Sequence, residues 1–253
     1  MKNQHKLVVV GHRGAKGLAL ENTAMSIEAA ISYGVAQVEI DLRMTLDGRV
    51  VLLHDENAVA RNGVIVHPNE QTYERLVQYF PDILTLEQLL PLVNHRCRIM
   101  LECKELAAVE PTVEILRTYF AKGWKPEEFM FASFKFNILE KFHALVPNVE
   151  IVVLDNWSSV RAVYRARKLG TSYLSMDQRY LWWGVIHSLS KHYKLFCYPN
   201  HKLIHIKHAK PAKWAKWGLY GVITDYPNFF LAKPTSSIVD SDESHISKAR
   251  GAD

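Results

Sequence analysis

One local pattern recurs eight times along the chain: a short apolar run, typical of a buried strand, is followed in all but the last case by a segment with apolar residues at helical spacing. Parallel strands need crossover helices, and eight of them close a sheet without edges. An open doubly wound sheet has fewer strands and a glycine-rich dinucleotide loop, which this chain lacks. We therefore predict an α/β fold, a (β/α)8 TIM barrel with a small β-hairpin inserted at the second strand. The predicted strands are residues 6–10, 38–46, 98–104, 129–134, 150–154, 172–176, 195–198 and 222–225.

Length and composition agree with one such barrel. The chain has 253 residues, of which 48% are hydrophobic and 23% charged, enough for a sizeable core. We assign residues 1–233 to a single barrel domain and expect 234–253, which are polar and charged, to be a disordered tail. There is no run of about 18 apolar residues, and the apolar stretch near the N-terminus is too short for a signal peptide. We expect a soluble, cytoplasmic protein without stable membrane association.

Charge and cysteine content exclude several function classes. The three cysteines show no CxxC spacing, which argues against a disulfide framework and a structural zinc site. The net charge of +5 favours anionic small molecules such as phosphates, but it is too dispersed to indicate nucleic-acid binding.

Residues 38–55 carry the first sign of a functional site. Asp47-Gly48 between two alternating runs predicts a two-residue type I′ hairpin turn. That register puts Asp41 opposite His54, and the two-residue period of a strand puts Glu39 on the same face. Carboxylates this close repel unless a cation lies between them, so the face favours Mg²⁺ or Ca²⁺. The hairpin alone also allows an ordinary solvated polar face.

The other predicted strands extend this cluster. A barrel brings the carboxyl ends of all its strands to one face, where active sites are built. Three carboxylates, two histidines, an arginine and a lysine from separate strands therefore converge there. The polar residues expected at this face are His12, Arg13, Glu39, Asp41, His54, Glu102, Lys104, Ser133, Thr224 and Asp225.

Taken in order, several short motifs resemble those of a known family. They are His12-Arg13-Gly14, Glu21-Asn22-Thr23, Glu39 and Asp41, Asp47-Gly48, His54-Asp55, Glu102 with Lys104, and residues 223–227. Over roughly residues 8–230 the chain resembles the glycerophosphodiester phosphodiesterases of the bacterial cytosolic type, which are (β/α)8 barrels. The resemblance implies hydrolysis of glycerophosphodiesters, the deacylated head groups of phospholipids, to glycerol 3-phosphate and an alcohol.

The resemblance also implies roles for the site residues. Glu39, Asp41 and Glu102 would ligate one divalent metal ion, Mg²⁺ or Ca²⁺. A metal and cationic side chains must neutralise the phosphate oxygens, because a phosphodiester is an anionic and poor electrophile.

By the same resemblance, Arg13 and Lys104 would bind the phosphate, and His12 and His54 would be the acid and base. Two imidazoles with pKa values near neutrality can move the two protons that the reaction requires. Which histidine is the base, and whether water or the substrate's own 2-hydroxyl attacks, does not follow from the sequence.

Two positions depart from the family pattern. Leu20 replaces the usual proline before the Glu-Asn-Thr motif and affects loop stiffness. Cys197 stands where the family has a tryptophan, which would remove an apolar wall on the glycerol side, with Phe134, Tyr198 or Trp182 as substitutes.

Two alternative functions remain open. A phosphodiesterase of the lysophospholipase D or sphingomyelinase D type would require an apolar rim, for which Tyr180, Trp182 and Trp183 are candidates. A catalytically idle phosphate-binding barrel would not need the two histidines that this chain has.

Overall fold

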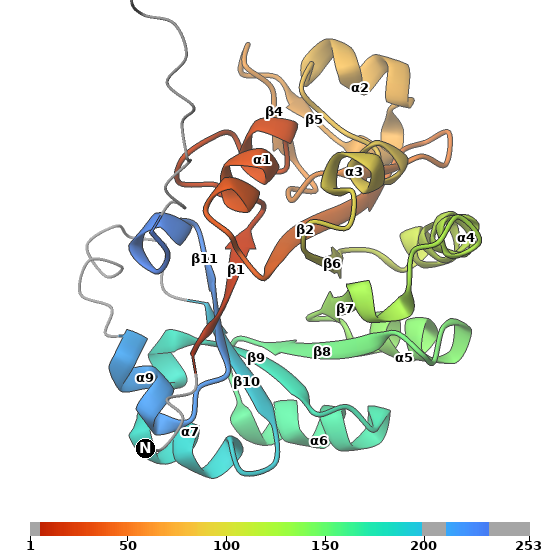
Figure 1. The fold of residues 1–253 in the computed structure, drawn as a ribbon. Coiled ribbons are helices and arrows are strands. Elements are labelled where there is room, and N and C mark those ends of the chain that lie inside the picture. The colour runs from red at the N-terminus through yellow and green to blue at the C-terminus, as the bar shows by residue number, and fades with distance from the viewer. Residues whose placement is uncertain (1–5, 199–210, 233–253) are drawn as a thin grey trace, which may run out of the picture.

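Eight parallel strands form a closed barrel in the computed structural model, which describes residues 6–198 and 211–232 (Figure 1). The first strand pairs with both the second and the last, so the sheet has no gap. The strands are β1 (Val8–His12), β2 (Gln37–Met44), β6 (Arg98–Cys103), β7 (Phe129–Ser133), β8 (Glu150–Asp155), β9 (Tyr173–Asp177), β10 (Lys194–Tyr198) and β11 (Gly221–Thr224). The predicted TIM barrel is confirmed.

Helices surround the strands (Figure 1). They are α1 (Ala24–Ser32), α3 (Leu86–Val93), α4 (Val109–Phe120), α5 (Phe136–Leu145), α6 (Ser159–Leu169), α7 (Trp183–Leu189) and α9 (Pro211–Trp217). Short 3₁₀ turns are η1 (Pro68–Glu70), η2 (Leu106–Ala108), η3 (Pro126–Glu128), η4 (Gln178–Tyr180) and η5 (Pro227–Phe229). Side-chain caps begin several helices: Thr23 caps α1, Thr85 caps α3 and Ser158 caps α6. None of these helices, within the described residues, is long and apolar enough to cross a membrane.

Alternate strand residues build two apolar layers. One set fills the barrel interior and comprises Val10, Met100, Met130, Val152, Phe196 and Ile223, among others. The other set faces the helices; for example, Phe131 of β7 stacks on Phe142 of α5 with ring centres 3.8 Å apart. Because neighbours along a strand face opposite sides, this alternation decides which residues at each strand end point into the barrel mouth.

The hairpin register differs from the prediction by one residue. Leu42 of β2 pairs with Leu52 of β3 (Val50–Leu52), and the Leu53 N–H donates to the Asp41 carbonyl at 3.1 Å. Asp41 is therefore opposite Leu53, and the predicted pairing of Asp41 with His54 is wrong.

The turn itself explains the shift. The hairpin loop contains three residues, 46–48, because Thr45 N–H bonds the Arg49 carbonyl at 2.9 Å. The Thr45 hydroxyl donates to Asp47 Oδ1 at 2.6 Å and accepts from the Arg49 N–H at 2.9 Å. Gly48 takes the left-handed conformation with φ +79°. A three-residue loop with a left-handed glycine replaces the predicted two-residue turn and moves the return strand by one position.

The insertion after β3 is larger than a hairpin. It contains β4 (Ala58–Val59), β5 (Ile65–Val66) and α2 (Tyr73–Tyr79), and the antiparallel pairing of β4 with β5 closes on the turn at Asn62-Gly63. Its apolar side chains form a small separate core with β3. The predicted tail, residues 234–253, lies outside the described part of the chain.

Candidate active site

Three carboxylates meet at the mouth of the barrel. Glu39 and Asp41 come from the inward face of β2, and Glu102 comes from the neighbouring strand β6. One oxygen from each lies within 4.8 Å of the others, and all three residues are buried. The structure therefore brings together the three residues predicted as metal ligands.

Burial raises the pKa values of two of these carboxyl groups, Glu39 and Glu102. Burial, together with the nearby charges of Asp41 and Glu102, raises the pKa of Glu39 well above its ordinary value. Burial also raises the pKa of Glu102. Glu39 Oε1 is buried and has no hydrogen-bond partner among the described residues. Oxygen ligands in such an arrangement fit a hard divalent cation.

Two cations flank the carboxylates. Lys104 Nζ lies 2.8 Å from Asp41 Oδ1 and donates to Glu102 Oε1, and Arg13 Nε lies 3.1 Å from Asp41 Oδ2. Burial opposes the charge of Asp41, but Lys104 and Arg13 outweigh it and hold its pKa below the ordinary value. Burial likewise disfavours the charges of Lys104 and Arg13, yet the carboxylates around them raise both pKa values. Both side chains remain cations beside the cluster.

The loop after β1 holds Arg13 in place. Arg13 has a positive φ of 50°, and its carbonyl accepts hydrogen bonds from the Asn22 N–H at 3.0 Å and the Ser26 hydroxyl at 2.9 Å. Asn22 Nδ2 in turn donates to Asp41 Oδ2 at 3.0 Å. A Cβ on Gly14 would lie 2.5 Å from the Ser26 backbone, so only glycine fits there. The His-Arg-Gly and Glu-Asn-Thr motifs thus lock together against Asp41.

His12, at the end of β1, is oriented by a residue to which the sequence assigned no role. Its Nδ1 shares a hydrogen bond with Asp225 Oδ1, and its Nε2 lies 3.9 Å from Glu39 Oε2. Burial lowers the pKa of His12, and the Asp225 carboxylate partly offsets this. Asp225 follows β11, two residues beyond the inward-facing Ile223. The two-residue spacing from Ile223 indicates that Asp225 faces the barrel mouth. Its contact with His12, however, depends on the pairing of β1 with β11, which the local sequence does not reveal.

His54 lies near the same cluster despite the changed register. Its backbone carbonyl accepts a hydrogen bond from Arg43 Nε at 2.8 Å, and its Nδ1 lies 2.6 Å from Asp55 Oδ1. Burial and the charge of Lys104 lower its pKa, whereas Asp41 raises it. The side chain keeps 34% of its surface exposed, so it faces the mouth from the solvent side.

Cys197 does not line the site. It is 2% exposed and packs in the layer between strands and helices, because the inward positions of β10 are Phe196 and Tyr198. Tyr198 meets Phe134 edge to face, with ring centres 6.4 Å apart. Of the three proposed substitutes for the missing tryptophan, these two face inward, whereas Trp182 is 64% exposed.

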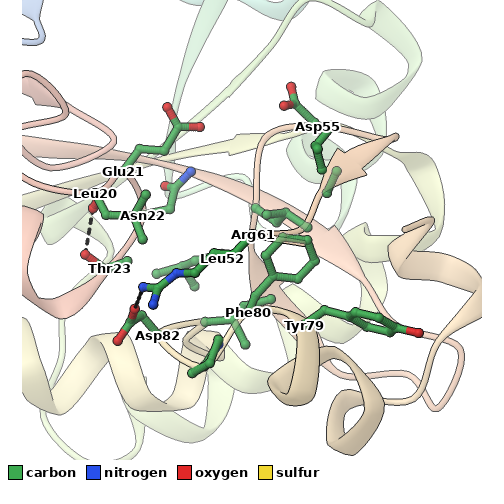
Figure 2. Close-up of a pocket in the computed structure, with 15 residues that line it drawn as sticks. Leu20, Glu21, Asn22, Thr23, Leu52, Asp55, Arg61, Tyr79, Phe80 and Asp82 are labelled. Atoms are coloured by element: carbon green, nitrogen blue, oxygen red, sulfur yellow. Dashed lines mark hydrogen bonds and ion pairs between the residues drawn. The ribbon is translucent and has the colours of Figure 1, made fainter. Parts of the chain in front are cut away.

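A mostly apolar pocket of about 230 Å³ adjoins the cluster (Figure 2). It lies between the Glu-Asn-Thr loop and the insertion. Three of its lining residues also bond to residues of the cluster: Glu21 to Arg13, Asn22 to Asp41, and Asp55 to His54. The remaining lining is mainly apolar, with an ion pair of 3.0 Å between the side chains of Arg61 and Asp82, which meet across the pocket in Figure 2. The pocket therefore shares a wall with the charged site.

Charges of both signs beside two imidazoles suit one kind of chemistry. Carboxylate oxygens can hold a hard cation, Arg and Lys can neutralise an anion, and imidazoles exchange protons near neutral pH. Located at the carboxyl end of a parallel barrel, this arrangement suits the metal-assisted hydrolysis of phosphate esters.

Comparison with known proteins identifies the family. The sequence pattern of the glycerophosphoryl diester phosphodiesterase family matches residues 12–229, and the chain therefore belongs to this family. A glycerophosphodiester phosphodiesterase of Bacillus altitudinis is 29% identical over 160 residues, which cover 58% of this chain and 65% of that enzyme.

Two solved structures share the fold of this chain. The glycerophosphodiester phosphodiesterase of Thermotoga maritima has a TM-score of 0.73 at 27% identity, over 89% of this chain and 97% of that one. A phosphodiesterase of Oleispira antarctica has a TM-score of 0.76 at 22% identity, over 88% of this chain and 94% of that one. These findings confirm the fold, the family and the enzyme class predicted from the sequence.

Proposed function

We propose that the protein hydrolyses glycerophosphodiesters to glycerol 3-phosphate and an alcohol with the aid of one divalent metal ion, Mg²⁺ or Ca²⁺. The observation that carries the proposal is the buried cluster of three carboxylates between two cations and two imidazoles. The Oleispira antarctica phosphodiesterase was solved with the product sn-glycerol-3-phosphate, the product that we propose here.

Glu39, Asp41 and Glu102 would hold the metal. Their oxygens lie within 4.8 Å of one another, and Glu39 Oε1 has no hydrogen-bond partner among the described residues. When bound, the metal would neutralise negative charge on the phosphate oxygens. It would also relieve the repulsion that raises the pKa of Glu39.

Arg13 and Lys104 would bind the phosphate. Both are nearly buried, and both remain charged because of the carboxylates around them. Fixed positive charges in a water-poor site stabilise the charge that develops on the phosphate oxygens during displacement. The planar guanidinium of Arg13 also offers several hydrogen-bond donors in a fixed geometry, and its contacts with Asp41 and Glu21 already orient it.

His12 and His54 would move the two protons. The bond from Asp225 to Nδ1 leaves the Nε2 of His12 directed toward the cluster. His54 approaches from a different segment and is partly open to solvent. One imidazole would take the proton of the attacking hydroxyl, and the other would give a proton to the leaving alcohol.

The test is release of glycerol 3-phosphate from glycerophosphocholine and glycerophosphoethanolamine. Protein stripped with a chelator is assayed with and without Mg²⁺ or Ca²⁺, alongside His12→Ala, His54→Ala and the control His143→Ala, which changes an exposed histidine of α5. We expect metal-dependent turnover that both site variants lose and the control keeps. Turnover that needs neither histidine would contradict the proposal. Metal and phosphate binding without turnover of any diester would indicate the idle binding barrel.

We also propose a cytoplasmic location. The cysteines Cys97, Cys103 and Cys197 are all free thiols, as expected in a reducing compartment. Because Cys103 and Cys197 are buried, the protein is isolated without reductant and then denatured before alkylation. Alkylation of all three thiols is the expected result, and a disulfide would contradict it.

A further inference from the structure

Exposed aromatic side chains gather on the loops that follow β8 and β9. Trp157, two residues after β8, is 73% exposed. Trp182, between β9 and α7, is 64% exposed, and Trp183, the first residue of α7, is 54% exposed. Tyr180 in the same segment is 37% exposed. Because β8 and β9 are neighbouring parallel strands, these side chains rise from adjacent points on the rim of the barrel mouth.

The opposite side of the mouth is apolar as well. In the closed order of strands, β1 lies across the barrel from β8. Leu20, in the loop after β1, is 58% exposed, and Val59 of the insertion is 63% exposed. Both also line the pocket of Figure 2. We call Leu20, Val59, Trp157, Tyr180, Trp182 and Trp183 the apolar rim.

Positive charges accompany the aromatic part of the rim. Arg161 and Arg179 are both substantially exposed and are held by the buried carboxylates of Asp155 and Asp177. Arg179 also lies over the ring of Tyr180, 5.9 Å from its centre. Tryptophan and tyrosine with arginine are the side chains enriched where proteins meet the boundary between lipid and water.

We propose that the apolar rim docks reversibly on a phospholipid surface that contains anionic lipids. Docking there places the barrel mouth against the head groups, so that phosphodiesters still anchored by one acyl chain can reach the site. This use of the site rests on the proposed function, whereas the docking itself does not. The sequence predicts no stable membrane association, and a few interfacial side chains give reversible binding, far weaker than a spanning helix.

The test is flotation of the metal-loaded full chain with vesicles of phosphatidylcholine and phosphatidylglycerol. The double variant Trp157→Ala with Trp183→Ala removes two rim side chains, and the matched control Tyr164→Ala removes an aromatic that is 59% exposed on the outer helix α6. We expect the control to float like the unchanged protein and the rim variant to partition at least about tenfold less. Hydrolysis of soluble glycerophosphocholine should be the same in all three proteins.

Different results would refute the docking proposal and the proposed hydrolysis of glycerophosphodiesters. Absence of the unchanged protein from the vesicle fraction would refute docking, as would a folded rim variant that floats equally well. Circular dichroism and the soluble assay establish that the variant is folded. Protein that floats but cleaves no soluble diester would leave docking intact and refute the proposed hydrolysis of glycerophosphodiesters.

Discussion

Replacing Asp225 by asparagine tests how His12 is held. Asp225 and the His12 side chain are both nearly buried, and the bond between them joins a carboxylate to the imidazole Nδ1. A hydrogen bond to a charged group contributes about 1.5–3 kcal/mol. If the bond strengthens as His12 becomes protonated, its loss lowers kcat by about 10-fold to 150-fold. The loss is larger if the asparagine amide selects the wrong imidazole tautomer.

The same substitution has a defined effect on pH dependence. Burial already lowers the pKa of His12, and the Asp225 charge is what partly restores it. Without that charge the pKa falls further, so the limb of the pH–rate profile that reports His12 moves to lower pH, whether His12 is the acid or the base.

The assay measures kcat and KM for glycerophosphocholine at saturating metal across about pH 5 to 9. Asp177→Asn is the matched control, since Asp177 is also a buried aspartate at a strand end but binds Arg179 instead of a histidine. We expect a large fall in kcat with little change in KM for Asp225→Asn only. An unchanged kcat and pH profile would refute an orienting role for Asp225.

Three further predictions follow from the site and the core. Glu39→Gln abolishes metal-dependent activity yet stabilises the metal-free protein by about 1–3 kcal/mol in urea unfolding, because burial raises the folded-state pKa of Glu39. This gain is absent below the ordinary pKa of 4.5, grows as pH rises from there toward the folded-state pKa, and is constant above it. Removal of metal by a chelator lowers the melting temperature less for Glu39→Gln than for the unchanged protein, and equal shifts would contradict the ligand role. Phe142→Ala, which empties a fully buried stack on Phe131, costs about 3–5 kcal/mol of unfolding free energy, against about 0.5 kcal/mol or less for the exposed Tyr164→Ala.

Local periodicity explains why much of the site follows from the sequence. Two pairs of site residues, Glu39 with Asp41 and Glu102 with Lys104, each occupy positions i and i+2 at the end of an apolar strand. That spacing fixes a common face whatever the rest of the chain does. The barrel then brings the two strands together, because β2 and β6 are neighbours in the sheet.

Features that depend on a single contact elsewhere do not follow from the sequence. The hairpin register depends on the Thr45 hydroxyl, which favours a three-residue loop where Asp47-Gly48 alone predicts two. Likewise, the motif aligns Cys197 with a family tryptophan that would form an apolar wall of the site, but strand alternation turns Cys197 toward the helices and leaves Tyr198 facing inward.

The bond between His12 and Asp225 also has a consequence for biosynthesis. The two residues are 213 positions apart: His12 ends the first strand, Asp225 directly follows the last strand, and these two strands pair with each other. A ribosome therefore releases the partner of His12 only after nearly all of the barrel has emerged. Contacts of such long range form late and slowly. Enzymatic activity should then appear only at the last step of folding, which makes turnover a reporter of barrel closure.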